Sequence, residues 1–401
     1  MVSDAHRFAC RKIGEEGIVL LQNDADLLPI NLSKVKRIAV VGENAIKMMT
    51  VGGGSSSLKA KYEITPLEGL KKRIGKQTEI VYARGYVGDP TGEYNGVKTG
   101  QNLKDDRTPE ELRLEAIQVA SNADLVLFIG GLNKSEHQDC EGTDRKTMDL
   151  PYNQNDLIMD LLRVNKHLVV INISGTGIAM PWKNHVSTIL QAWYLGSETG
   201  NALASVLLGD VNPSGKLPYT YYASLSQCGA HRLGEYPGHK GMDALGNEVY
   251  DMPYNEGLFV GYRFIDKYKL KPTFPFGHGL SYTTFKYGKA KVDSKVLERN
   301  GQLCITIPIT NTGKRAGAEV VQLYIKSLNS SVVRPVKELK GFCKVELQPN
   351  ETKEVSFTIT AEELSYFNDK QHKWVAESGL FEALLASSSA DIRSKVSFEL
   401  K

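Results

Sequence analysis

The chain has 401 residues, of which 41% are apolar and 24% are charged, a composition typical of globular proteins and a length that suggests two or three domains. Forty-nine Lys and Arg residues nearly balance 46 Asp and Glu residues, and the formal charge is only +3. This balance offers no broad basic surface to nucleic acid or anionic lipid, and no apolar run reaches the ~20 residues of a membrane span. We therefore expect neither a nucleic acid nor a membrane as a partner.

The N-terminal 21 residues carry charged side chains throughout and lack the uninterrupted apolar core of a secretory signal. Either the protein is cytoplasmic or its export signal lies on a segment outside this sequence, so the compartment stays open. Five scattered cysteines show neither a C-x-x-C pair nor the spacing of a zinc site, and we expect free thiols. They are Cys10, Cys140, Cys228, Cys304 and Cys343.

Strands and helices alternate over the first half of the chain. Residues 5–22 predict an amphipathic helix that runs into a short strand, within an N-terminal lead-in segment over 1–29. The expected strands beyond it are 37–42, 78–82, 124–130, 168–173 and 187–192, and the expected helices are 66–73, 109–122, 153–164 and 200–208. This alternation indicates a mostly parallel sheet covered by helices, that is, an α/β sandwich domain over residues 30–222.

The second half of the chain changes character twice. Residues 223–289 are rich in Gly, Pro and aromatic side chains without a sustained period, and predict a long ordered connector. Residues 290–401 then carry short apolar runs separated by turn residues. The runs are 303–310, 319–327, 336–345, 352–360, 379–387 and 391–400. Short strands at this spacing, with few helical segments, predict an all-β sandwich.

The densest group of reactive side chains follows the predicted strand 124–130. It comprises four carboxylates, a histidine and an arginine: Glu136, His137, Asp139, Glu141, Asp144 and Arg145. Ligands of parallel α/β sheets collect beyond the carboxyl ends of the strands. Repulsion between neighbouring carboxylates, together with partial burial, can raise a pKa enough to keep one of them protonated. A protonated carboxyl is the group with which a glycosidase protonates a departing sugar oxygen.

Two other interpretations of this loop stay open. One is a solvated polar loop in which Asp144 and Arg145 form an ion pair. The other is a metal site made by His137, Asp139 and Glu141, although no second histidine lies at ligand spacing.

Other motifs carry less information. The Gly-rich run Val51–Ser57 lacks the spacing of a phosphate-binding fingerprint and predicts a close-packing loop or the lining of a sugar pocket. Trp182, Trp193, Tyr194 and the stretch 250–264 are candidates for stacking on a sugar ring, with packing in the core or at a domain interface as the alternative for each. No G-x-S-x-G nucleophile motif exists. Cys140 lies near His137, but the flanking carboxylates are expected to raise the pKa of its thiol and so to oppose a cysteine nucleophile.

Several strings, taken in order, match one known family and span almost the whole chain. They are 17–23, 27–29, 65–69, 141–145 (Glu-Gly-Thr-Asp-Arg), 149–151, 191–196, 209–218, 259–263 and 274–282. Together they resemble glycoside hydrolase family 3, whose members are typically β-glucosidases and β-xylosidases. The resemblance implies an α/β sandwich domain followed by a fibronectin-type-III-like sandwich, in agreement with the pattern of predicted elements.

The resemblance also implies a retaining mechanism that needs no cofactor and no metal. The acid/base glutamate of members with an E-G-x-D-R run corresponds to Glu141, with Glu136 as the alternative, and Trp193, Asp144 and Arg145 are the implied substrate contacts. The aspartate nucleophile of the family belongs to an N-terminal (β/α)₈ barrel that has no counterpart in this sequence. Ser3-Asp4 resembles its Ser-Asp pair only superficially, because Ala5 follows in place of an aromatic residue.

We therefore expect the C-terminal part of a retaining β-glucosidase-like hydrolase. It would supply the acid/base glutamate to a site for β-glucosides or β-xylosides that a barrel on another chain or segment completes. The alternative is a non-catalytic carbohydrate-binding or assembly module. Family members are often periplasmic or secreted.

Overall fold

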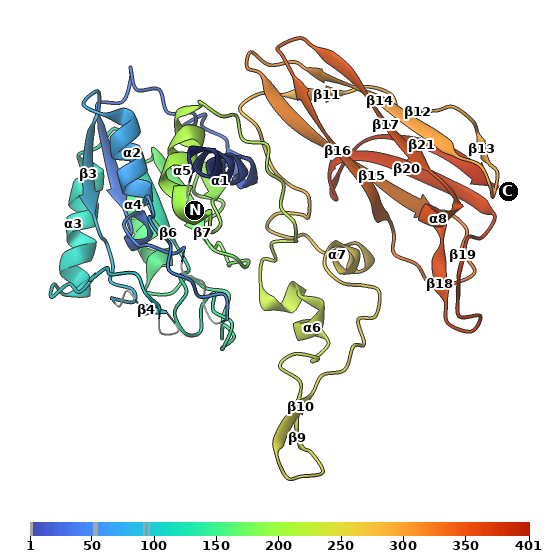
Figure 1. Ribbon diagram of the computed structural model, residues 1–401, viewed down its shortest axis with the longest axis horizontal. Helices are drawn as coiled ribbons and strands as arrows, with labels where there is room; N and C mark the ends of the chain where they lie inside the picture. Colours follow the sequence, from blue (N-terminus) through green and yellow to red (C-terminus); the bar gives the residue numbers. More distant parts are fainter. Residues whose placement is uncertain (1–2, 51–54, 91–92, 95–96) are drawn as a thin grey trace. The chain divides into compact units, whose positions relative to one another are not determined.

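The computed structural model describes residues 3–50, 55–90, 93–94 and 97–401. The chain divides into two compact units, Met1–Gly215 and Lys216–Lys401 (Figure 1). Within the described residues, no helix is both long enough and apolar enough to cross a membrane. All five cysteines lie in described parts of the chain and are free thiols, as their spacing predicted.

The first unit is built on a six-stranded sheet in the order β1-β8-β7-β6-β2-β3. The strands are β1 (Val19–Asn23), β2 (Arg37–Val41), β3 (Glu79–Ala83), β6 (Leu125–Gly131), β7 (Leu168–Ile173) and β8 (Thr188–Gln191). Every neighbouring pair is parallel except β1 with β8, which is antiparallel. The prediction of a mostly parallel sheet is confirmed, and the N-terminal strand forms its antiparallel edge.

Helices flank this sheet. They are α1 (Asp4–Gly17), α2 (Pro66–Ile74), α3 (Pro109–Ser121), α4 (Gln154–Val164) and α5 (Thr199–Leu208), with 3₁₀ turns at η1 (Glu43–Ala45) and η2 (Gly196–Glu198) and short strands β4 (Glu93–Tyr94) and β5 (Val97–Lys98). Both α2 and α3 begin at a threonine that accepts a hydrogen bond from the third residue of the helix, with proline at the first position, the usual start signal. All residues of β6 and β7 are buried, which explains their unbroken apolar sequences.

Helices α2 and α5 approach unusually closely. A Cβ atom built on Gly69 of α2 would lie 2.1 Å from the carbonyl oxygen of Gly200 at the start of α5, and one built on Gly200 would lie 2.1 Å from the oxygen of Thr65. Glycine at both positions therefore lets the two backbones touch. This contact fixes α5, which follows the loop after β8.

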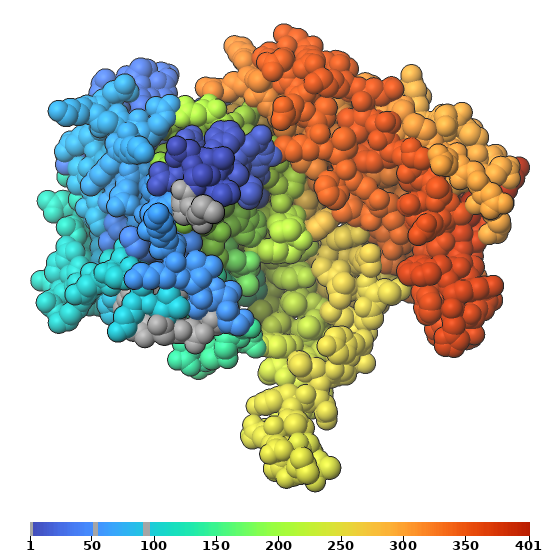
Figure 2. Space-filling view, in the orientation of Figure 1, coloured from blue at the N-terminus to red at the C-terminus, as the bar shows by residue number. Residues whose placement is uncertain are grey.

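The second unit begins with a connector that holds η3 (Leu225–Gln227), α6 (Gly229–Arg232), a hairpin of β9 (His239–Met242) and β10 (Glu248–Asp251), and α7 (Tyr262–Tyr268). The sequence predicted an ordered connector but not this hairpin, which protrudes from the surface (yellow in Figure 2). Its turn and flanks expose apolar side chains, with Leu245 87% and Tyr254 84% exposed.

The remainder of the second unit is the predicted all-β sandwich. One sheet has the order β11-β14-β12, with β17 also paired to β14, and the other has the order β13-β21-β20-β15-β16. Their bounds are β11 (Phe285–Tyr287), β12 (Lys291–Val292), β13 (Val296–Leu297), β14 (Leu303–Asn311), β15 (Gly317–Ser327), β16 (Glu338–Leu347), β17 (Thr352–Ile359), β20 (Gly379–Ser388) and β21 (Asp391–Leu400), with α8 (Ala361–Leu364) and a small hairpin of β18 (Tyr366–Asn368) and β19 (Lys373–Val375) beside them. Alternate residues of β14 are buried, as expected for a strand with one face in the core.

Candidate functional site

The loops that follow β6, β7 and β8 meet at the carboxyl edge of the first sheet. The loop after β6, residues 132–153, carries the predicted group of four carboxylates and is called the acidic loop below. It leaves the strand at Gly131, whose φ of +124° and whose position against the Ile173 oxygen, 2.1 Å from an ideal Cβ, both require glycine. The side chain of Gln154, the first residue of α4, bonds both the N–H and the C=O of Gly131 at 2.8 Å. The start of the loop is therefore fixed to its end.

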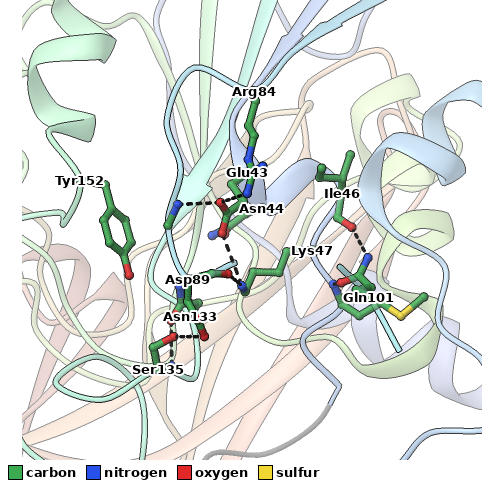
Figure 3. Close-up of polar contacts among 12 residues, drawn as sticks. Glu43, Asn44, Ile46, Lys47, Arg84, Asp89, Gln101, Asn133, Ser135 and Tyr152 are labelled. Carbon is green, nitrogen blue, oxygen red and sulfur yellow. Dashed lines mark hydrogen bonds and ion pairs between the residues drawn. The ribbon is translucent and has the colours of Figure 1, made fainter. Parts of the chain in front are cut away.

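A buried group of charges lies beside this edge (Figure 3). Glu43, two residues after the end of β2, is 1% exposed. Its carboxylate accepts a hydrogen bond from Arg84 Nη2 at 2.8 Å and pairs with Lys47 Nζ at 3.4 Å. The second Arg84 nitrogen, Nη1, lies 3.5 Å from the Asp105 carboxylate. Two cations and two carboxylates thus compensate one another, which is what makes the burial of each charge tolerable.

This buried group connects to the acidic loop through Asp89. Glu43 accepts a hydrogen bond from the Gly88 N–H at 2.6 Å, and Lys47 Nζ donates to the Asp89 carbonyl oxygen at 2.5 Å. The Asp89 carboxylate in turn accepts a hydrogen bond from Ser135 Oγ at 2.7 Å (Figure 3). The first part of the acidic loop is therefore tied to the loop that follows β3.

Asp139 ties the same loop to the other two loops of this edge. Its carboxylate accepts hydrogen bonds from the Gly175 N–H and the Thr176 hydroxyl, each at 2.6 Å, and from the Tyr194 hydroxyl at 2.8 Å. Gly175 and Thr176 follow β7, and Tyr194 follows β8. The Lys134 ammonium lies 3.6 Å above the centre of the Tyr194 ring, a cation–π contact.

The predicted site residues Asp144 and Arg145 end this segment. Arg145 Nη1 donates to Thr176 Oγ1 at 3.1 Å and to the Gly177 oxygen at 2.7 Å. Asp144 is exposed, and its carbonyl oxygen lies 3.1 Å from His137 Nδ1. Arg145 is thus engaged with the loop after β7.

Both candidate acid/base glutamates are exposed. Glu141 accepts a hydrogen bond from the Ser55 N–H, and hydrogen bonds from the Ser55 hydroxyl and N–H hold the pKa of this carboxyl below its ordinary value. The expectation that crowding and partial burial raise the pKa is therefore wrong for Glu141 in this chain, because the side chain is solvated and bonded to donors. Glu136 lies 3.8 Å from His137 Nε2.

The metal-site interpretation of this loop is not supported by the geometry. Asp139 is directed at Gly175, Thr176 and Tyr194, whereas Glu141 is directed at Ser55. Across the described ranges, no group of three or more His, Cys, Asp and Glu side chains is placed to hold a metal ion.

The expectation for the Cys140 thiol is also wrong in sign. Burial raises its pKa, but this effect is outweighed by hydrogen bonds from Thr143 and from the backbone N–H groups of His137 and Gln138, and the net pKa is lowered. The Sγ atom lies 3.2 Å from Thr143 Oγ1. Local donors in the tight loop, which the sequence did not reveal, thus outweigh the effect of burial on the thiol.

The Gly-rich run is described only in part, because residues 51–54 lie outside the described residues. Its remaining part, Ser55–Ser57, approaches the acidic loop through the Ser55–Glu141 contact. The run therefore ends beside the candidate acid/base residue.

Two models of protein families match the chain. The model described as the glycosyl hydrolase family 3 C-terminal domain matches residues 18–282, and the model described as a fibronectin type III-like domain matches residues 319–389. The chain belongs to glycosyl hydrolase family 3. The fibronectin type III-like match lies within the β-sandwich of the second unit.

Curated relatives and solved structures agree with this assignment. The chain is 47% identical over 407 residues to the beta-glucosidase BoGH3A of Bacteroides ovatus, covering 100% of this chain and 52% of that protein. It is 37% identical over 408 residues to a beta-xylosidase of Formosa agariphila, covering 100% and 51%. The structure of the Kluyveromyces marxianus beta-glucosidase in complex with glucose superposes with a TM-score of 0.87 at 27% identity, covering 100% of this chain and 63% of that chain. The chain spans about half the length of the curated relatives it matches.

The two tryptophans considered as sugar contacts differ in their environment. Trp182 is fully buried and donates to Asn155 Oδ1 at 2.9 Å, so it is a core residue. Trp193 is half-buried, has a φ of +47°, and donates its indole N–H to the Gly17 oxygen at 2.8 Å. It lines a small pocket, partly open to solvent, with Lys47, Met49, Glu63, Pro66, Ile173, Tyr194, Leu195, Gly196 and Thr199.

Asp89 and Thr176 were not expected from the sequence to belong to this site. Each lies just beyond a strand of the parallel sheet, and that position was the available signal. Their pairing could not be inferred, because the partners of Asp139 lie 36 to 55 residues away along the chain.

Proposed function

We propose that this chain supplies the general acid/base, Glu141, of a retaining β-glycosidase. The observation that carries the proposal is the placement of Glu141. It lies exposed at the carboxyl edge of the sheet, within the E-G-x-D-R run, on a loop held at Ser135, Asp139 and Arg145. An exposed carboxyl on a fixed loop can reach a substrate bound outside the chain.

In the proposed reaction, an aspartate on a barrel outside these 401 residues attacks the anomeric carbon. The bond to the leaving oxygen breaks as the Glu141 carboxyl gives that oxygen its proton, and a glycosyl-enzyme forms. Glu141, now a carboxylate, then takes a proton from a water molecule, whose oxygen attacks the anomeric carbon and releases the aspartate. Retention requires the two carboxyl groups to lie about 5–5.5 Å apart.

The first step needs Glu141 in its protonated form, whereas its pKa in this chain lies below the ordinary value. We propose that a bound sugar and the barrel displace water from the Glu141 carboxyl. Desolvation disfavours the charged form and raises a carboxyl pKa. The barrel therefore has a second role besides supplying the nucleophile.

The proposed substrates are terminal β-glucosides or β-xylosides, because the named relatives are beta-glucosidases and a beta-xylosidase. Trp193 would meet a sugar through its ring face, since its N–H donates to Gly17. Asp144 and Arg145 are the further proposed substrate contacts. No cofactor takes part in the proposed reaction.

The second candidate is a non-catalytic carbohydrate-binding or assembly module. The specific observation in its favour is the contact of the exposed Glu141 carboxyl with Ser55, which lowers its pKa and so disfavours the protonated form that an acid needs. The two functions are distinguished by whether hydrolysis by a reconstituted enzyme requires the Glu141 carboxyl.

The test is a chimera in which this chain replaces the matching half of the Bacteroides ovatus beta-glucosidase. Glu141→Gln should lower hydrolysis of aryl β-glycosides with poor leaving groups by ~10²-fold or more, the scale of acid/base catalysis. Glu136→Gln is the matched control and should have little effect. If Glu141→Gln leaves the rate unchanged, the acid/base assignment is wrong, and a loss in Glu136→Gln would transfer it to that residue.

A further inference from the structure

We propose that Asp139 is a positioning residue that holds the backbone of the loop carrying Glu141 in place. This inference rests on the proposed function of Glu141. Asp139 precedes Glu141 by two residues, and its carboxylate accepts three hydrogen bonds from donors on two other loops. Its own N–H donates to the Asn133 oxygen at 3.0 Å. Asp139 therefore makes one hydrogen bond within the acidic loop and connects this loop to the loops after β7 and β8.

Thr176 links two residues of the acidic loop to each other. Its hydroxyl donates to the Asp139 carboxylate at 2.6 Å and accepts from Arg145 Nη1 at 3.1 Å. Asp139 and Arg145 lie on either side of Glu141 in the sequence, so both ends of the segment that carries Glu141 are held on one hydroxyl. Glu141, in the middle of this segment, is exposed, whereas Asp139 and Arg145 are held by hydrogen bonds.

The chemistry of the donors favours a carboxylate at position 139. An N–H and two hydroxyl groups point at its oxygens, and an ionised carboxylate is an acceptor at both oxygens. An asparagine of the same size would present an NH₂ group to at least one of these donors. Hydrogen bonds to a charged acceptor are also stronger than neutral ones.

The first arm of the test uses the 401-residue chain and does not depend on activity. Hydrogen exchange of the amides in residues 137–143 should accelerate by about tenfold or more in Asp139→Asn, because charge-assisted bonds that hold the loop are lost. Thr176→Val should act in the same direction, and Thr176→Ser, which keeps the hydroxyl, should not. The matched control is Asp124→Asn, since Asp124 accepts two backbone hydrogen bonds at the opposite end of β6 and should leave this loop unchanged.

The second arm measures how kcat/KM, which reports formation of the glycosyl-enzyme, depends on the leaving group in the chimera. A displaced acid affects poor leaving groups, which need a proton, more than activated ones. Asp139→Asn should therefore lose about tenfold or more with a poor leaving group and little with a dinitrophenyl glycoside. General unfolding would lower both rates together.

The outcomes separate the two proposals. Unchanged exchange in Asp139→Asn, or an equal loss with both leaving groups while Glu141→Gln is selectively impaired, overturns the positioning role. An unimpaired Glu141→Gln enzyme overturns the proposed function and with it the catalytic consequence of Asp139. The exchange data would then still decide whether Asp139 holds the loop.

Discussion

Ser135 Oγ donates a hydrogen bond to the Asp89 carboxylate at 2.7 Å, and this contact joins the candidate catalytic loop to a buried group of charges. The Asp89 carbonyl oxygen accepts from Lys47, which pairs with Glu43 (Figure 3). The stability of the sheet edge and the order of the loop therefore depend on the same residues.

Glu43→Gln is expected to destabilise the chain strongly. It removes a carboxylate that compensates two buried cations, Lys47 and Arg84, which are 2% and 5% exposed. Removing one partner of a buried charge pair costs about 3–5 kcal/mol, and urea unfolding monitored by circular dichroism would measure this loss.

Glu79→Gln is the matched control for the buried charges. Glu79 pairs with Arg37 at 3.5 Å, but their side chains are 60% and 39% exposed, so the expected loss is below about 1 kcal/mol. Equal losses in the two variants would contradict the structural importance of Glu43.

Gly69→Ala is expected to lower stability although alanine favours helices. The new methyl group would meet the Gly200 carbonyl, 2.1 Å from the ideal Cβ. Overpacking of this kind costs about 1–3 kcal/mol, more than the ~1 kcal/mol gained in helix propensity. Thermal unfolding would measure the difference.

Gly17→Ala is the comparison for Gly69→Ala, because a Cβ on Gly17 meets nothing within 4 Å. This variant should be neutral or stabilised by up to about 1 kcal/mol. A stabilised Gly69→Ala protein would show that α2 and α5 are further apart than described.

The Glu141 carboxyl of the isolated chain should titrate below its ordinary value of 4.5, because Ser55 donors favour its charged form. The folded-state pKa is lower than the unfolded one. The contact therefore stabilises the fold above the unfolded pKa, and this contribution is lost as the pH falls through the folded pKa. A ¹³C NMR titration of the Glu141 side chain would report the midpoint.

Ser55→Pro removes both the hydroxyl and the N–H donor, and should move the Glu141 midpoint up toward 4.5. Ser56→Ala is the control and should not move it. A midpoint at or above the ordinary value in the unaltered chain would contradict the Ser55–Glu141 contact.

The sequence predicted the parts of the fold that local patterns determine. The apolar runs that became β2, β6, β7 and β8 were recognisable because strands of a covered parallel sheet are buried on both faces. The sandwich was recognisable because its short apolar runs are separated by turn residues at regular spacing. The β9–β10 hairpin was missed, because its strands are largely exposed and leave no periodic apolar pattern.

The sequence suggested where the candidate site lies, but it did not reveal the contacts within it. The carboxyl edge of the sheet follows from strand order, and Glu141 follows from the family motif. Nothing distinguished Asp139 from the three other carboxylates of the acidic loop, since its role depends on Thr176 and Tyr194. The sign of the Glu141 pKa shift depends on Ser55, which lies 86 residues away in the sequence.

The central claim is that Glu141 is the acid/base residue, and azide rescue of Glu141→Ala in the chimera tests it most directly. Azide needs no base and can attack the glycosyl-enzyme in the space left by the shortened side chain. We predict that azide restores turnover of an activated aryl β-glucoside and yields the β-glycosyl azide, whereas Glu136→Ala gives neither effect. Rescue in Glu136→Ala alone, or full activity of Glu141→Ala without azide, would contradict the claim.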